Sequence, residues 1–426
     1  MKTSNDLFRG LLKTVKDQGK KKRRRVGRSL VDVVRLIEEY SVEELCQAAE
    51  DYFKKVKDLN YLLSKPFASL HEAPSLLINF AHLIQGLHLV PGLTVLDFGA
   101  GSCWASRLLN QMGCSVISLD ASYTALTIGK KLTSRQPIFG KQPEHTFLQF
   151  NGRTIDLPDD SVDRVFCYDA FHHVPNQLEV LREMCRVLRK GGIAGFSEPG
   201  PDHSESPQAQ EEMRNHRVVE NDIVIGDIFE QAKKVGFTDM RLLIYSLEPI
   251  VASFDKSDQL LEQGDLFLDY VHKTINYSQN HNTFFLCKGE NELYDSRYRD
   301  GLLADIAVNV NSLLVKEGES FDIEVRVKNI SNKVWLPSGG NTGSVNLGAH
   351  LHDVDNSLLQ SGYLRVPLSE ERSKKILPDE MVMVRCSMTA LKTGKYIVEF
   401  DLVSENVCWF KESGSITECV AITVKH

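Results

Sequence analysis

Between residues 94 and 198, short apolar runs alternate with longer amphipathic stretches, and this alternation limits the possible folds more than any other feature of the chain. The segment NQLEVLREMCRVLRK (176–190) has the apolar spacing of a helix, and Gly191-Gly192 after it is a helix-stop signal. Strand–helix alternation of this kind predicts right-handed βαβ units and a doubly wound, mostly parallel sheet. The predicted strands are 94–99, 115–120, 145–150, 163–169 and 192–198.

Two further apolar runs, MRLLIYS (240–246) and NTFFLCKG (282–289), would complete a seven-stranded sheet. If they pair antiparallel at the sheet edge, no crossover helix has to lie between them. The 35 residues that separate them, 247–281, are too many for a plain hairpin loop and include aromatic residues such as Phe254 and Tyr270. We interpret this segment as an insertion that folds over the sheet edge and is a candidate lid.

The two ends of the chain have different patterns from this α/β region. Residues 1–60 place apolar side chains at three- and four-residue intervals, which predicts a helical region. After Gly301 the period changes to two, as in FDIEVRVK (321–328) and KYIVEFDL (395–402), which predicts an all-β immunoglobulin-like sandwich. Within it, LKTGKY (391–396) resembles a tyrosine corner. The expected domains are a helical 1–60, an α/β domain over 61–290, a linker over 291–302 and a sandwich over 303–426.

Charge and cysteine content exclude several classes of protein. The chain carries a net charge of −7, but residues 13–28 alone carry +8, so the remainder sums to −15. An acidic body argues against a nucleic-acid surface along the chain, and KKKRRR (20–25) is either a solvated segment or a patch for a polyanionic partner. The nine cysteines form no CxxC pair, which is typical of reduced thiols in a cytoplasmic protein. No apolar run is long enough to span a membrane.

The stretch VLDFGAGSCWAS (95–106) predicts a ligand at the end of the first strand. A dinucleotide fingerprint would place a third glycine where this chain has Trp104, and the Asp97 carboxylate would repel a pyrophosphate. A cationic ligand without phosphate fits better, and S-adenosylmethionine is such a ligand. Asp120 ends the second strand, 21 residues after Gly99, where an acid can accept both ribose hydroxyls.

On these residues, 94–198 resembles the class I S-adenosylmethionine-dependent methyltransferases. The matching segments are VLDFGAGSCW, VISLDAS, FNGRTIDLPDDSVDRVFCYDAFHHV and RVLRKGGIAGFSEPG. The resemblance implies S-adenosylmethionine as cofactor. It departs at Asn151, where the family usually has an acid that reads the adenine amino group, although an amide oxygen could accept the same hydrogen bond. The implied cofactor-binding residues are Asp97, Gly99, Ala100, Gly101, Asp120, Ala121, Asn151, Gly152 and Asp169.

Methyl transfer in this family is an in-line displacement in which positioning supplies much of the catalysis, and a hydroxyl acceptor also needs a base or a metal. The candidates past the strand ends are His172, His173, Glu198, His203 and, further along the chain, His216. Alternatively, the histidine pair shapes its loop and Glu198 orders it. The sequence contains no HExxH motif or ligand-spaced cluster, so no metal site is predicted. It also lacks the [DN]PP[YFW] motif of nucleic-acid amino-group methylation, having CYDAFHHV instead.

The C-terminal stretch GKYIVEFDLVSENVCWF (394–410) resembles immunoglobulin-like domains attached to bacterial surface-polysaccharide enzymes. Trp335 and Trp409 fit either a sugar-stacking face or a buried sandwich core. The resemblance favours O-methylation of a carbohydrate or glycoconjugate in polysaccharide biosynthesis. Two alternatives stay open: a methyltransferase for a lipid or natural product whose sandwich forms a homodimer, and a non-catalytic glycan- or partner-binding protein with a residual methyltransferase fold.

Overall fold

The computed structural model describes residues 30–135, 143–257, 264–289, 295–371 and 374–426. The basic run KKKRRR lies outside these residues, so the two interpretations of it remain untested. The chain divides into two compact units, one formed by 1–89 with 93–292 and the other by 90–92 with 293–426. The described part of the predicted helical region 1–60, residues 30–60, belongs to the α/β unit and is not a unit of its own.

The first unit is built on a seven-stranded, mostly parallel sheet, as the alternation predicts, and its strand order is β3-β2-β1-β4-β5-β7-β6. Only β7 runs antiparallel to its neighbours, which confirms the predicted edge pairing of the last two strands. The strands are β1 (Thr94–Phe98), β2 (Ser115–Asp120), β3 (His145–Gln149), β4 (Val162–Tyr168), β5 (Leu188–Pro199), β6 (Asp239–Leu243) and β7 (His281–Cys287).

Helices cover both faces of this sheet. Phe284 belongs to the apolar core that includes side chains of α8 and α10, whereas its neighbour Phe285 lies so close to Gly86 of α5 that no side chain fits there. The helices are α2 (Val33–Glu39), α3 (Val42–Lys55), α4 (Leu59–Ser64), α5 (Ala73–Gly86), α6 (Trp104–Gln111), α7 (Tyr123–Arg135), α8 (Gln177–Val187), α9 (Pro207–His216), α10 (Ile225–Val235) and α12 (Asp265–Asn280).

One predicted helix boundary is wrong. The helix expected to reach Lys190 ends at Val187, and Leu188 already begins β5. Gly191 does not stop a helix but adopts a φ of +80° inside the strand, where the pairing of β4 with β5 shifts in register. The sequence misleads here because glycine marks strand bulges as well as helix ends.

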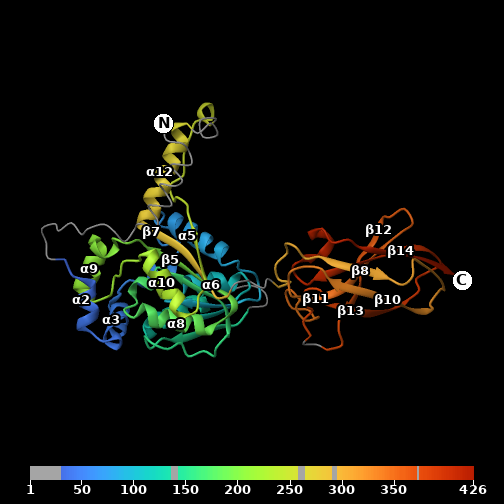
Figure 1. Ribbon diagram of the computed structural model, residues 1–426, viewed down its shortest axis with the longest axis horizontal. Coiled ribbons are helices and arrows are strands. Elements are labelled where there is room, and N and C mark those ends of the chain that lie inside the picture. The colour runs from blue at the N-terminus through green and yellow to red at the C-terminus, as the bar shows by residue number, and fades with distance from the viewer. Residues whose placement is uncertain (1–29, 136–142, 258–263, 290–294, 372–373) are drawn as a thin grey trace. The chain divides into compact units, whose positions relative to one another are not determined.

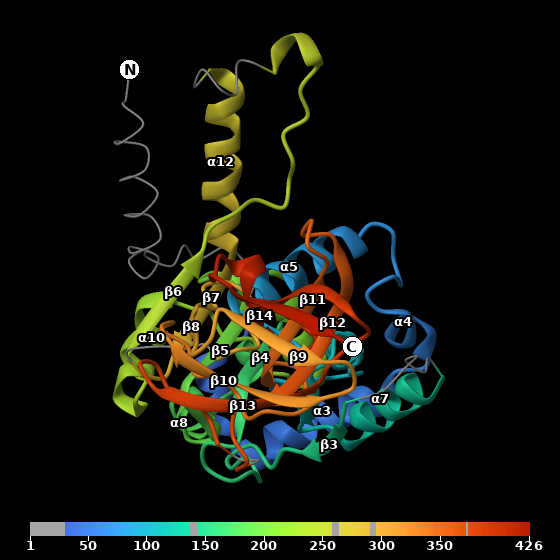
Figure 2. The same cartoon turned by 90° about the vertical axis from the view of Figure 1, so that its right-hand side faces the viewer.

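The insertion between β6 and β7 also differs from the prediction. Its helix α12 extends away from the sheet and does not fold over the edge (Figures 1 and 2). Thr274 is the one buried residue of α12, while Phe254 ahead of the helix is 92% exposed. A hydrogen bond of 2.9 Å from the Tyr277 hydroxyl to Asn79 of α5 fastens its last turns to the unit.

The second unit consists of two antiparallel-rich sheets with the orders β13-β10-β8 and β12-β11-β14-β16-β9, with β15 paired to β14. They enclose one apolar core, to which β10 contributes Ile323, Val325 and Val327 in the predicted alternation. The strands are β8 (Ala304–Val308), β9 (Ser312–Lys316), β10 (Ser320–Asn329), β11 (Val345–His352), β12 (Leu358–Pro367), β13 (Met381–Thr389), β14 (Gly394–Ser404), β15 (Cys408–Trp409) and β16 (Glu418–Lys425).

Two local predictions for this unit can be checked. The Tyr396 hydroxyl donates to the Lys392 carbonyl at 3.1 Å, which is the upstream backbone bond expected of a tyrosine corner. The predicted linker is wrong where it is described, because Ser296 bonds to Gly343 and Leu302 is fully buried in the core of this unit.

Both tryptophans of this unit are occupied by protein contacts. Trp335 is fully buried and packs edge-on against Phe410. Trp409 has the His350 ring at 4.0 Å and the Arg365 guanidinium at 4.2 Å from its ring. Their packing supports the buried-core interpretation for Trp335 and leaves Trp409 as a partly covered surface ring.

Candidate cofactor and acceptor site

The loop after β1 takes its shape from backbone that few residue types can adopt. Gly99 and Gly101 have φ values of +70° and +51°, and a Cβ on Gly99 would lie 2.3 Å from Ala170. Cys103 adopts the left-handed φ of +58° without being glycine. Its side chain fits because Gly129 of α7 faces it, where a Cβ would lie 2.3 Å from the sulfur.

Asp120 ties this loop to the end of β2. Its carboxylate accepts the Gly101 N–H and the Ser122 N–H, each at 2.8 Å. Burial raises the pKa of Asp120 to about 6, although both N–H donors act in the opposite direction. The carboxylate is thus placed beside the glycine loop, as a ribose-binding acid must be, and its lone pairs exceed the two donors that it already accepts.

Helix α3 covers the loops after β2 and β3. Glu50 of α3 accepts hydrogen bonds from the Ser122 hydroxyl at 2.6 Å, the Thr124 N–H at 3.0 Å and the Thr124 hydroxyl at 2.7 Å. Burial would raise the pKa of Glu50, but these donors hold it at about 2. Cys46 of the same helix lies so close to Gly152 that a Cβ there would be 2.6 Å from the sulfur.

Asp97 is at the end of β1, as predicted, but its carboxylate lies under α6. It is 2% exposed and accepts a short hydrogen bond from the Ser106 hydroxyl, which in turn accepts one from Ser118 at 2.7 Å. Burial raises the pKa of Asp97 to about 7. Its predicted contact with a cofactor ammonium group therefore remains a prediction.

Asn151 follows β3 at the predicted position, but its amide is already engaged. The Oδ1 atom accepts the Arg153 and Thr154 N–H groups, each at 2.8 Å, and Nδ2 donates to the Thr154 hydroxyl. An adenine amino group would have to share this oxygen. Of the other predicted contacts, Ala100 is 8% exposed, and the Ala121 carbonyl accepts a bond from Gln149 at 3.3 Å.

On the acceptor side, Glu198 at the end of β5 orders the loop after β4. Its Oε1 accepts the Ala170 and Phe171 N–H groups at 3.0 and 2.9 Å, and its Oε2 accepts the His172 N–H at 3.2 Å and lies 2.7 Å from His172 Nδ1. The side chain is fully buried. Of the two predicted roles, this geometry favours the loop-ordering carboxylate over a group that touches substrate.

The histidines converge on a carboxylate that the sequence did not reveal, Glu220. Its Oε2 lies 2.7 Å from His203 Nε2 and 3.6 Å from His172 Nε2, and its Oε1 lies 3.5 Å from His173 Nδ1. Burial would lower the pKa of His172, but the hydrogen bond to Glu198 and the surrounding carboxylates raise it to about 9. The remaining candidate, His216, packs edge-on against Tyr52 of α3.

Asp169 lies at the boundary between the cofactor half of the site, formed by the loops after β1, β2 and β3, and the acceptor half, formed by the loops after β4 and β5. It follows β4 with a φ of +54°, its N–H donates to the Ser197 carbonyl at 2.8 Å, and its carboxylate side chain is 66% exposed. The ionisable side chains that act on it include His172, Lys65 and His281. His281 was not predicted; its Nε2 lies 3.0 Å from the Ser197 hydroxyl, and burial lowers its pKa to about 4.

With this geometry in view, comparison with known proteins identifies the central part of the first unit. Residues 96–196 match the family model described as "Methyltransferase domain". After this model, the segment 96–196 is referred to below as the methyltransferase domain. It includes the glycine loop, Asp120, Asp169 and the histidine pair.

Two curated relatives of this segment are methyltransferases. The methyltransferase domain is similar to the sarcosine/dimethylglycine N-methyltransferase of Halorhodospira halochloris, with 35% identity over 26% of this chain and 39% of that protein. It is also similar to the demethylmenaquinone methyltransferase of Renibacterium salmoninarum, with 29% identity over 28% of this chain and 47% of that protein. The chain thus spans less than half the length of either.

Among solved structures, the chain is similar to a putative sarcosine dimethylglycine methyltransferase from Galdieria sulphuraria. The identity is 17%, the TM-score is 0.38, and the match covers 58% of this chain and 98% of that one.

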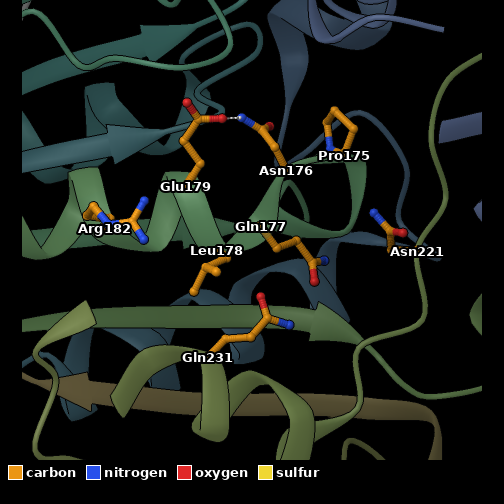
Figure 3. A pocket seen from close by; sticks show the side chains of 8 residues that line it. All are labelled: Pro175, Asn176, Gln177, Leu178, Glu179, Arg182, Asn221 and Gln231. Carbon is orange, nitrogen blue, oxygen red and sulfur yellow. Dashed lines mark hydrogen bonds between the residues drawn. The ribbon is translucent and has the colours of Figure 1, made fainter. Parts of the chain in front are cut away.

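A surface hollow is another feature of the first unit. A polar hollow of about 520 Å³ lies between α8 and α10 (Figure 3), and none of the predicted site residues lines it. Asn221, one of its lining residues, holds the loop after β4 by donating to the carbonyls of His172 and Val174.

The described residues contain no helix with the length and apolar character that a membrane span requires.

Proposed function

We propose that this chain is an S-adenosylmethionine-dependent methyltransferase whose acceptor is a hydroxyl group of a polar small molecule. The observation that carries the proposal is the placement of Asp120 and the Gly99–Gly101 loop at one sheet edge, within the matched methyltransferase domain. The cofactor, when bound, supplies a methyl group on a sulfonium. Asp120 would hold the ribose, and the glycine loop would admit the amino-acid end.

The acceptor side supports oxygen as the methylated atom. An amine with a free electron pair needs no base, whereas a hydroxyl must lose its proton during the transfer. Around Glu220 lie His172 and His173 of the loop after β4 and His203 of the segment after β5, close to Asp169. Such a group can accept or hold a proton at the end of β4, where doubly wound sheets bind their ligands.

The same side chains favour a polar acceptor over a lipid. A sterol or quinone placed against the Asp169 carboxylate and the histidine rings would remove water from these groups without giving them hydrogen bonds, which costs free energy. A carbohydrate or glycoconjugate hydroxyl is therefore the acceptor class that we propose, and the C-terminal sandwich is its candidate holding domain. Because Trp409 is covered by Arg365 and His350, such holding would use other surfaces than a free tryptophan face.

The cofactor site is tested by titrating the full chain with S-adenosylmethionine in a calorimeter. We expect binding that is lost in Asp120→Ala, because both the ribose contact and the bond to Gly101 disappear. Asp156→Ala, an exposed acid in the same domain, is the matched control and should bind normally. Intact protein that binds no cofactor would remove the enzyme interpretation and leave a binding protein.

The acceptor class is tested by competition. Labelled methyl transfer to a mixture of oligosaccharides, quinols and sterols is followed by mass spectrometry. Label on sugar oxygen is expected. Label on a lipid or natural product instead would retain the methyltransferase and replace the acceptor.

A further inference from the structure

Two histidines and a carboxylate in the acceptor half meet as metal ligands do. One ligand atom from each of His172, His173 and Glu220 lies within 4.8 Å of the other two. The histidines are consecutive, but Glu220 comes from the segment between α9 and α10, 47 positions after His173. No spacing motif in the sequence would show this set.

The two histidine rings meet Glu220 through different nitrogen atoms, Nε2 of His172 and Nδ1 of His173. His173 Nδ1 lies 2.8 Å from the Val219 carbonyl and 3.5 Å from Glu220 Oε1. His172 Nδ1 likewise lies 2.7 Å from Glu198 Oε2. A histidine that ligates a metal almost always donates its other N–H to a carboxylate or a backbone carbonyl, and His172 has the Glu198 carboxylate as that partner.

The distance between His172 and Glu220 is that of an ion pair or of two ligands of one metal ion. His172 Nε2 and Glu220 Oε2 are 3.6 Å apart, beyond the 2.7–3.2 Å range of an ordinary hydrogen bond. Two ligands at about 2.0–2.1 Å from a tetrahedral zinc ion lie roughly 3.3 Å from each other. The observed separation is thus close to the one that a bound ion would set.

The surrounding contacts hold this set in place before any ion arrives. Glu220 is 3% exposed, and its Oε2 is fixed by His203 at 2.7 Å. Asn221 connects the segment that carries Glu220 to the loop after β4. Its backbone N–H and its side-chain amide donate to the His172 carbonyl at 2.9 and 3.0 Å. The His173 side chain is 41% exposed, which gives an ion a route in.

We propose that His172, His173 and Glu220 bind a divalent transition-metal ion of the zinc class. Glu198 and His203 form the outer shell that orients His172 and Glu220. Two histidines and a glutamate form the ligand set of zinc sites that keep a position open for water or substrate. Metal binding at this site can be tested independently of the methyltransferase activity.

A role for the ion rests on the proposed function. A hydroxyl of the acceptor bound at the open position would have its pKa lowered, so its proton would pass to water. The new bond forms between that oxygen and the methyl carbon, the bond between the carbon and the sulfonium sulfur breaks, and neutral thioether leaves.

The test uses tag-free, full-length protein stripped by a chelator and titrated with Zn²⁺ and with Co²⁺, whose visible absorption reports tetrahedral ligation. We expect one ion per chain. His173→Ala, at a partly exposed position, should weaken binding by more than the roughly 10–100-fold that loss of an outer-shell partner causes, and Glu198→Gln by about that amount. Glu220→Gln should abolish the cobalt spectrum.

The matched control is His352→Ala, which removes a histidine that pairs with a glutamate, Glu399, at 3.0 Å in the other unit. It should leave metal binding unchanged. Stripped protein that binds no Co²⁺, or binds it equally well as His173→Ala, would overturn the proposal and leave a proton between His172 and Glu220. Calorimetry with S-adenosylmethionine on the same samples separates this result from failure of the proposed function, because metal binding and cofactor binding are measured separately.

Discussion

The cofactor half and the acceptor half of the candidate site are held in place by different kinds of contact. In the cofactor half, Asp120 is held by backbone N–H groups of Gly101 and Ser122, which lie 19 and 2 positions away in the chain. In the acceptor half, Glu198 holds residues 26–28 positions away, and Glu220 brings together three histidines from two loops. The first half depends on backbone shape, and the second on buried charges that neutralise each other.

The largest effect should come from the acceptor half. Glu198→Ala leaves three buried N–H groups and the His172 ring without their acceptor. Removing one partner of a buried charge pair typically costs about 3–5 kcal/mol, so the free energy of unfolding in urea should fall by that amount. Glu38→Ala, at an exposed position on α2, should change it little. A loss below about 1 kcal/mol would show that the loop does not depend on this carboxylate.

In the cofactor half, Asp97→Asn tests a buried carboxyl group whose neighbours in the described part of the chain are Ser106 and Asp120 and include no cation. The pKa of Asp97 is about 7 in the fold against 3.8 in its unperturbed state. Between these values the folded chain keeps a proton that the unfolded chain releases, so stability falls as pH rises through this range. The asparagine variant should therefore gain stability relative to the native chain, roughly 2–4 kcal/mol, between pH 5 and pH 8.

The measurement for this variant is urea unfolding at several pH values. Asp156→Asn, which replaces an exposed acid of the same domain, should show the same pH dependence as the native chain. Parallel curves for Asp97→Asn and the native chain would mean that the Asp97 carboxylate stays ionised in the fold.

Gly129→Ala examines how the backbone shape of the cofactor half is accommodated. Its Cβ would collide with the Cys103 sulfur, and overpacking of this kind costs about 1–3 kcal/mol. Adding Cys103→Gly should restore most of the loss, because it removes the sulfur at a residue whose φ of +58° glycine adopts freely. Gly226→Ala in α10, with open space around its Cβ, is the control in a thermal melt. Additive losses in the double variant would refute the pairing.

The smallest effect is expected from the cover over the cofactor half. Glu50→Gln weakens the bonds from α3 to Ser122 and Thr124, each worth about 0.5–1.5 kcal/mol, so affinity for S-adenosylmethionine should fall roughly 3–10-fold. Because the pKa of Glu50 is lowered to about 2 from 4.5, its contribution is present above pH 4.5 and is lost as pH falls toward 2. Asp51→Asn, the next residue of α3, should bind the cofactor normally in calorimetry. Equal affinities for both variants would show that α3 does not cover the site.

Much of the first unit could be predicted because its signals are local. The strands of 94–198, the antiparallel final pair and the position of Asp120 all follow from apolar periodicity and from glycines next to a strand end. The errors occur where one residue type has two meanings, as at Gly191, or where an exposed segment has no pattern that fixes its direction, as in 247–281.

The sequence by itself determined that the chain has an α/β region with a ligand loop at one sheet edge, followed by an all-β region. Only the tertiary structure decided that Glu50 covers that edge and that Glu220 joins His172 and His173. The physical reason is that strand periodicity and turn chemistry act between near neighbours in the chain. A carboxylate on a distant loop has no such pattern, and its partners are chosen only when packing brings it out of water beside them.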